Sequence, residues 1–279
     1  MSERYMWQDM RKYIFIILAM TCLFEVFSQN TLESELVKKI KSFKTDKQLN
    51  DFLVENKMIP ESEDSSYFFH VGRIQTDIFK KNIFNDLEEE VILQLRENKR
   101  YAVNVFYYKN KNLIKIPGYI LEKSYSDPGY GEQIFTFHFE NIFMLNDYSI
   151  VCRHYTEFNR TTYEKYSVWD ICKDSLMIVY EFELNSSTYS GILTYDYSTI
   201  GNYGFVTLNN EYPKVLNINK KIKNINNAQR NDESELVSGI ITEINTQKTV
   251  YFGKDNKGWK VVRIDENLNS KVIYIDNEQ

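Results

Sequence analysis

The residues best placed to do chemistry in this sequence are His138 and Glu140, which lie two positions apart in the stretch Ile134–Glu140. Phenylalanine occupies positions 135, 137 and 139 of that stretch, and the even positions are mostly polar. This period of two predicts a strand in which His138 and Glu140 share the polar face. An imidazole beside a carboxylate can do general acid–base work, as a hydrolase requires. An ordinary solvated strand face gives the same pattern, and it is the interpretation that we prefer.

The cysteines offer a second chemistry. The sequence has three, and Cys152 and Cys172 are the two that lie outside the N-terminal segment. In an oxidising compartment a lone pair of cysteines favours a disulfide. Two buried free thiols are the alternative. A metal site is a third hypothesis, because His154 shares a strand face with Cys152, but a structural zinc needs four ligands and no fourth is evident.

The established catalytic motifs are not found. The sequence has no GxSxG, HExxH, P-loop, CxxC or GxGxxG motif. It has only three histidines, which leaves little material for a site built on several of them. We therefore expect no cofactor and no metal, and a protein that is not an enzyme is the favoured interpretation.

The N-terminus indicates export. The apolar run Tyr13–Phe24 follows Arg11 and Lys12, and the small residue Ser28 comes shortly after it. A positive flank, a short apolar core and a small-residue exit are typical of a secretory signal peptide. We expect residues 1–28 to be removed and Gln29 to begin the mature chain. A membrane span needs about 20 apolar residues, so no stable membrane span is expected after cleavage.

Two alternatives for this segment stay open. Translation from Met10 instead of Met1 would give a more ordinary signal, because it would remove the acidic residues Glu3 and Asp9. A lipid anchor at Cys22 is the second, although the residues around Cys22 fit a lipoprotein site poorly. The predicted location is the periplasm, the cell surface or the extracellular space.

Composition narrows the class of partner. The hydrophobic content of 43% is that of a folded protein, and the formal net charge is −5. No basic block stands out except Lys220–Lys223, so binding to nucleic acid has little electrostatic support. The chain has 27 Asn, 21 Tyr and 3 Ala. AT-rich codons explain this bias, and a tyrosine-rich binding face is the functional alternative.

The periodicity predicts an α+β fold with N-terminal helices, then an antiparallel β meander, as an open sheet or a partly closed barrel, and a short C-terminal β tail. We expect about eight strands between Tyr101 and Leu208. The predicted elements before them are helices over residues 31–43, 46–58 and 84–97 and a strand over residues 67–74.

Four segments are predicted along the chain. After the signal peptide, residues 29–216 form the main α+β domain. Residues 217–233, rich in Asn and Lys, form a linker or an exposed arm. Residues 234–279 are a set of strands that either stands alone or belongs to the main domain.

Three functions are compatible with these features. We favour an exported, non-catalytic protein of the cell envelope or periplasm that binds another protein, for example an immunity protein that neutralises a toxin. The second is a carrier or sensor for a small apolar or sugar ligand. The third is a hydrolase that uses His138 and Glu140.

Overall fold

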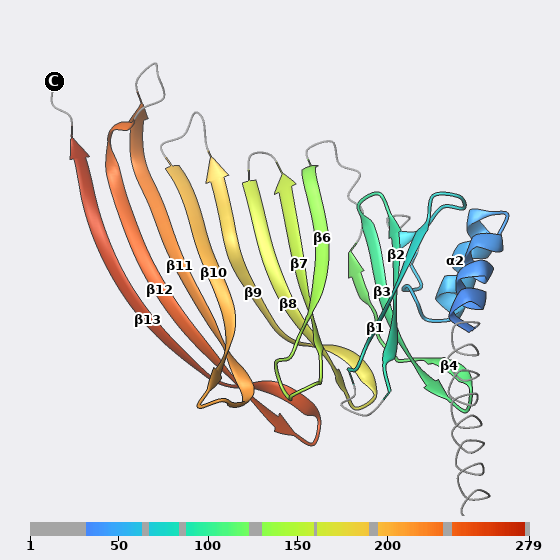
Figure 1. Cartoon of the computed structure of the whole chain (residues 1–279). Coiled ribbons are helices and arrows are strands. Elements are labelled where there is room, and N and C mark those ends of the chain that lie inside the picture. The colour runs from blue at the N-terminus through green and yellow to red at the C-terminus, as the bar shows by residue number, and fades with distance from the viewer. Residues whose placement is uncertain are drawn as a thin grey trace, which may run out of the picture.

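The computed structural model describes residues 32–62, 67–83, 88–122, 130–158, 161–189, 195–230 and 236–276. Two N-terminal helices precede two antiparallel sheets, which confirms the predicted α+β class (Figure 1). Neither sheet closes on itself within these residues, so the open sheet is the alternative observed. The predicted signal peptide, with its cleavage site, Cys22, Met1 and Met10, lies outside the described residues.

The helices cover one side of the molecule. The first spans residues 32–42 and the second, α2, spans Asp46–Glu55. Thr45 caps α2, because its Oγ1 accepts a hydrogen bond from the backbone N–H of Gln48 at 3.3 Å. Leu49 and Leu53 lie one turn apart on α2 and are fully buried. Both helices were predicted from this spacing.

The smaller sheet, here sheet A, lies beneath the helices. Its strands are β1 (Gln75–Lys81), β2 (Glu90–Glu97), β3 (Arg100–Lys109), β4 (Asn112–Lys115) and β5 (Ile120–Glu122). Their order is β1-β2-β3-β4, and β5 also pairs with β3. The β3–β4 hairpin turns at Asn110 and Lys111, which both have positive φ, as the tight turns that fit the twist of antiparallel strands require.

The larger sheet, sheet B, is an eight-stranded meander in which each strand pairs with its neighbours in the chain. Its strands are β6 (Tyr130–Glu140), β7 (Ser149–Phe158), β8 (Thr161–Cys172), β9 (Ser175–Tyr189), β10 (Tyr195–Leu208), β11 (Glu211–Arg230), β12 (Leu236–Asp255) and β13 (Gly258–Asp276). The eight strands β3 to β10 confirm the number expected between Tyr101 and Leu208.

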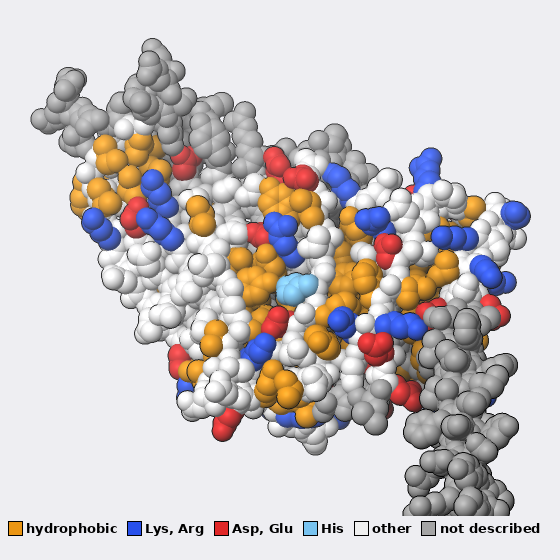
Figure 2. Space-filling view, viewed as in Figure 1, with side chains coloured by type: hydrophobic (Ala, Val, Ile, Leu, Met, Phe, Trp, Pro, Cys, Tyr) orange, Lys and Arg blue, Asp and Glu red, His pale blue; other side chains and the backbone are white. Residues whose placement is uncertain are grey.

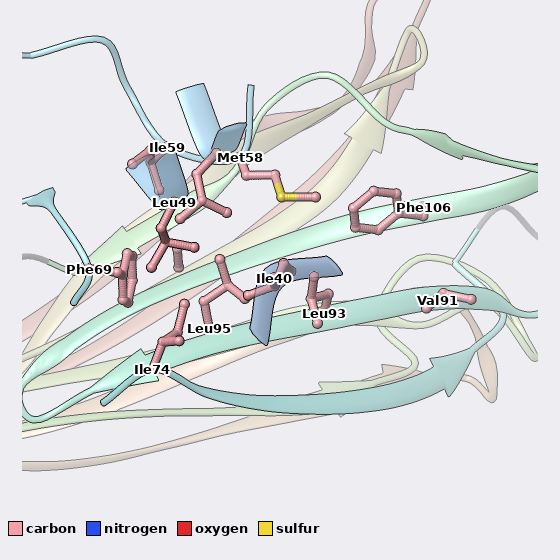
Figure 3. Close-up of a cluster of buried hydrophobic side chains, with 12 residues drawn as sticks. Ile40, Leu49, Met58, Ile59, Phe69, Ile74, Val91, Leu93, Leu95 and Phe106 are labelled. Carbon is pink, nitrogen blue, oxygen red and sulfur yellow. The ribbon is translucent and has the colours of Figure 1, made fainter. Parts of the chain in front are cut away.

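Three apolar clusters hold the layers together. The first lies between the helices and sheet A, and Figure 3 shows Leu49 and Met58 pointing toward the side chains of β2 and β3. The second joins the other face of sheet A to β6, β7 and β9 of sheet B, with Val103, Ile150 and Leu176 fully or almost fully buried. The third lies on the opposite face of sheet B and is built around Tyr166, Phe182 and Leu216.

These clusters define two faces of sheet B. We call the face that packs on sheet A, which carries Phe135 and Cys152, the sheet-A face. The other, which carries Val151 and Tyr166, is the opposite face. At one end of the sheet the β12–β13 turn folds back over the opposite face, where the Trp259 ring stacks on Phe143 with centroids 4.7 Å apart. Figure 1 shows this turn curling beneath β10 and β9.

Two predicted elements are wrong. Residues 84–97 were expected to be a helix, but residues 90–97 form strand β2, and residues 84–87 lie outside the described part. The strand is buried on both faces, between the helices and sheet B, so its sequence loses the alternation of a half-exposed strand. The strand expected over residues 67–74 is not formed either, and β1 begins at Gln75.

The C-terminal segments also differ from the prediction. The Asn- and Lys-rich stretch expected to be a linker is part of β11 as far as Arg230. Within β11 this stretch has isoleucine at positions 218, 222 and 225 with polar residues between them, and asparagine, a turn former in most contexts, lies here in a hydrogen-bonded strand. The strands after residue 234 are hydrogen-bonded to β11, so they continue sheet B. Asp255 pairs with Gly258 at the tight turn between β12 and β13.

Candidate functional site

His138 and Glu140 lie on the opposite face of β6, as the alternation predicted, where they pair with Val151 and Ser149. Glu140 does not face His138 as a free carboxylate, because Lys214 Nζ forms an ion pair with its Oε1 at 2.6 Å. Burial lowers the pKa of His138 from its ordinary value, and the Glu140 charge opposes that shift. The imidazole is therefore neutral at pH 7 and the carboxylate is engaged elsewhere.

Cys152 and Cys172 are both free and buried, so the predicted disulfide is not formed. Cys152 pairs with Ser167, which lies five residues before Cys172 on β8. At about 3.3 Å per residue, the two thiols are roughly 16 Å apart along the strand, whereas the Cα atoms of a disulfide lie within about 7 Å. The alternative of two buried free thiols is the one observed.

A polar chain that the sequence did not reveal links the two sheets. Glu122 of β5 contacts His154 of β7, with Oε2 2.7 Å from Nδ1. The other ring nitrogen, Nε2, lies 3.3 Å from Ser167 Oγ on β8. The indole N–H of Trp169 donates to the same oxygen at 2.8 Å. One serine hydroxyl thus accepts from the indole N–H and lies within hydrogen-bond distance of the imidazole, so that Ser167 links Trp169 to His154.

A serine, a histidine and a carboxylate in this order have the connectivity of an activated nucleophile. Ser167, however, is 1% exposed and lies between two sheets, so a substrate does not reach its hydroxyl in this conformation. The chain of contacts instead fixes β5 against sheet B. Its members are 32 and 13 residues apart in sequence. Only the strand register brings them together, and no motif could have indicated them.

The most unusual surface is the outer half of sheet B, from β10 to β13. Figure 1 shows these strands extending past sheet A and the helices as a single layer. On the sheet-A face of this region, one residue from each strand forms a row of amides, which we call the amide row: Asn202, Asn219, Gln247 and Asn267. Each is exposed, and Asn219 Nδ2 donates to Asn202 Oδ1 at 3.1 Å.

The amide row borders a shallow depression of about 500 Å³. Asn245 and Asn269 form a second pair of amides two residues farther along β12 and β13. In Figure 2 the left part of the molecule is mostly white, the colour of uncharged side chains and backbone, with charged and apolar groups above it. The surface thus offers many hydrogen-bond donors and acceptors, and Lys220 and Lys221 lie beside the amides.

The other side of β13 carries exposed apolar side chains together with Glu266 and Ser270. Leu268 and Tyr274 are 64% and 75% exposed, and Ile264 and Val272 are also exposed. These residues alternate with polar ones along the strand, so they share the opposite face. Most of the aromatic side chains lie elsewhere: the rings of Tyr166, Phe182 and Tyr203 pack together farther in on the same face. The outer surface thus presents amide and aliphatic side chains together with Tyr274, and the three rings form an aromatic cluster farther in.

Two further observations concern the described residues. Among them, no three metal-ligating side chains come together, and Cys152 with His154 gains no further ligand. No helix in the described part of the chain is long and apolar enough to cross a membrane. Comparison of the sequence with protein families, curated proteins and solved structures finds no match to any of them.

Proposed function

We propose that this chain is an exported, non-catalytic protein of the cell envelope or periplasm that binds another protein, and that the partner covers the sheet-A face of β10–β13. One observation carries the proposal: beyond the buried residues of the third cluster, this half of sheet B is a single layer, and the amide row on its sheet-A face is exposed among the described elements. A sheet ordinarily buries at least one face against another layer. A partner would supply that layer.

The chemistry of the surface fits a polypeptide. The amide row can donate and accept hydrogen bonds, as a protein backbone and its polar side chains require. Ile200 adds an apolar anchor beside the row, since it is 71% exposed. Interface cores are depleted in charged residues, and the row itself carries none. Sheet A lies next to this surface, so a partner bound there would also contact sheet A on one side (Figure 1).

A capture experiment tests the proposal. The protein is expressed from its full-length gene with a C-terminal tag, and the mass of the processed chain is measured to locate any cleavage near Gln29. Partners are captured from envelope and culture fluid. The double variant Asn219→Lys and Gln247→Lys places two charges in the amide row, and Asn256→Lys in the exposed β12–β13 turn is the matched control.

We expect one stoichiometric polypeptide with the wild type and the control, and its loss with the double variant. Capture that is equal for all three proteins would place the binding surface elsewhere. An empty capture from both sources would remove the protein-binding function and leave the second candidate.

The second candidate is a carrier for a sugar, and the amide-lined depression favours it because amides bind polyols through paired hydrogen bonds. Titration with envelope glycans, followed by the amide signals of Asn and Gln side chains in NMR, distinguishes the two. Shifts confined to the amide row at millimolar glycan or below would support the carrier. A hydrolase based on His138 and Glu140 gains no support, since Lys214 engages the carboxylate.

A further inference from the structure

The outer edge of sheet B is a long strand, β13, which spans Gly258–Asp276. Among the residues that the structure describes, β13 is hydrogen-bonded to β12 on one side and to no strand on the other. Residues 262–272 are all exposed. Every second backbone N–H and C=O along this strand therefore points outward, which is the template on which another strand can add.

We infer that a second copy of this chain pairs with β13 in antiparallel fashion, about a twofold axis through Leu268, to form a continuous sixteen-stranded sheet. The inference does not rest on the proposed function, because it follows from the edge of sheet B and would hold whether or not another protein binds the sheet-A face. A twofold axis perpendicular to the sheet keeps the sheet-A faces of both copies on the same side.

Strand alternation limits the possible registers. Residues that pair across an antiparallel interface lie on the same face, so allowed registers differ by steps of two residues. With the axis at Leu268, Asp265 of one copy lies opposite Lys271 of the other, and this pair occurs twice. Lys271 forms no ion pair with any residue whose side chain the structure describes, although Glu243 lies opposite it on β12. Asp265 already contacts Arg263 Nη2 of its own chain at 3.0 Å, so the Lys271 ammonium of the second copy adds a second cation to each Asp265.

The apolar residues match in the same register. Leu268 lies opposite its own copy and Ile264 lies opposite Val272, all on the opposite face and all exposed in the single chain. On the sheet-A face Asn267 of one copy lies opposite Asn269 of the other, so the amide side chains of the two copies are neighbours across the interface.

The neighbouring registers lose this match. A shift of two residues in one direction places Arg263 opposite Lys271, two like charges. The same shift in the other direction places Glu266 opposite Val272. Directly opposed residues have Cβ atoms about 5 Å apart, so charge and apolar matches there select the register.

The association is measured first by light scattering on the purified chain between 1 and 200 µM, about the range in which a moderate dimer forms. We expect a mass twice that of the single chain. A single-chain mass at every concentration would overturn the inference. So would assemblies that grow with concentration, which would indicate a head-to-tail contact between β13 and the other sheet edge.

Charge exchange then tests the register. Asp265→Lys places like charges opposite each other twice and should weaken dimerisation by about tenfold or more. Asp265→Lys combined with Lys271→Asp restores the pair and should recover the dimer. Both variants change exposed side chains, and circular dichroism confirms that each is folded. Equal dissociation constants for the wild type and both variants would overturn the register.

A cysteine cross-link supplies a direct readout of the axis. Leu268→Cys should form a disulfide-linked dimer under mild oxidation, because the two copies of residue 268 face each other. Glu266→Cys is the control: its counterpart lies opposite Ser270, so the two introduced thiols are four residues or about 14 Å apart. Equal cross-linking of both variants would show a random encounter and would contradict the inference.

Discussion

The buried carboxyl group of Asp170, near the end of β8, provides a quantitative test of the structure. Its side chain is 3% exposed. Burial and, to a smaller extent, the charge of Asp147 raise its pKa from 3.8 to about 8. The backbone N–H of Ile171 donates to Asp170 Oδ1 at 2.8 Å and opposes the shift without reversing it. Asp170 is therefore mostly protonated at neutral pH in the folded protein.

This shift makes stability depend on pH. The unfolded chain releases the same proton at a pKa of about 3.9. Between about pH 4 and pH 8 the folded state therefore binds more protons than the unfolded state, and the free energy of unfolding falls as the pH rises. Each pKa unit is worth about 1.4 kcal/mol. The contribution of Asp170 should fall by about 4 kcal/mol between pH 5 and pH 8.

Asp170→Asn isolates this contribution, because asparagine has nearly the same shape and does not ionise. The free energy of unfolding of the variant minus that of the wild type should increase by about 4 kcal/mol from pH 5 to pH 8. Urea denaturation followed by tryptophan fluorescence measures it at each pH. Asp174→Asn, in the exposed β8–β9 turn, is the control and should give a flat difference. A flat difference for Asp170→Asn as well would refute the reasoning, because Asp170 would then carry the same charge in both states.

Three further predictions concern individual contacts. Burial alone would raise the pKa of Glu164, but hydrogen bonds from Asn185, Arg153 and Tyr166 outweigh burial and lower it. Glu164→Gln should therefore reduce the free energy of unfolding by about 2–3 kcal/mol at pH 7. This loss should shrink below pH 4, because the wild-type carboxylate is then protonated as well. A loss that is constant with pH would contradict the prediction. Thr45→Ala should cost about 1 kcal/mol, measured by thermal melting, through loss of the α2 cap, whereas Thr45→Ser should cost little. Cys152 and Cys172 should resist alkylation in the native protein and react fully in urea without reductant, read by peptide mass spectrometry; failure to react in urea would show that they form a disulfide.

The sequence predicted secondary structure best for elements that have one buried face and one solvent-exposed face. The alternation of phenylalanine in β6 and the helical spacing of Leu49 and Leu53 both reflect a single buried face, and both elements were predicted correctly. β2 was predicted wrongly because it is buried on both faces, so that Val91, Ile92 and Leu95 fit the period of a helix as well as that of a strand.

The polar sites were harder to predict because they depend on register. Asn219 and Gln247 lie on consecutive strands, but only the register of β11 against β12 places them side by side. In the sequence alone, the asparagines around position 219 indicated a linker, since asparagine is common in turns. The contact between Glu122 and His154 likewise required the placement of sheet A on sheet B.

The connectivity of sheet B has a consequence for how the protein can change. Because every strand is hydrogen-bonded only to strands adjacent in the chain, removing or duplicating one hairpin at the C-terminal end would alter the width of the sheet without rethreading any other part. The helices and sheet A pack on the first strands of sheet B, and the remaining strands extend the sheet beyond that contact. The width of sheet B is therefore set by the number of hairpins at its C-terminal end. Related genes of different length could keep the packed part and differ in the width of the sheet.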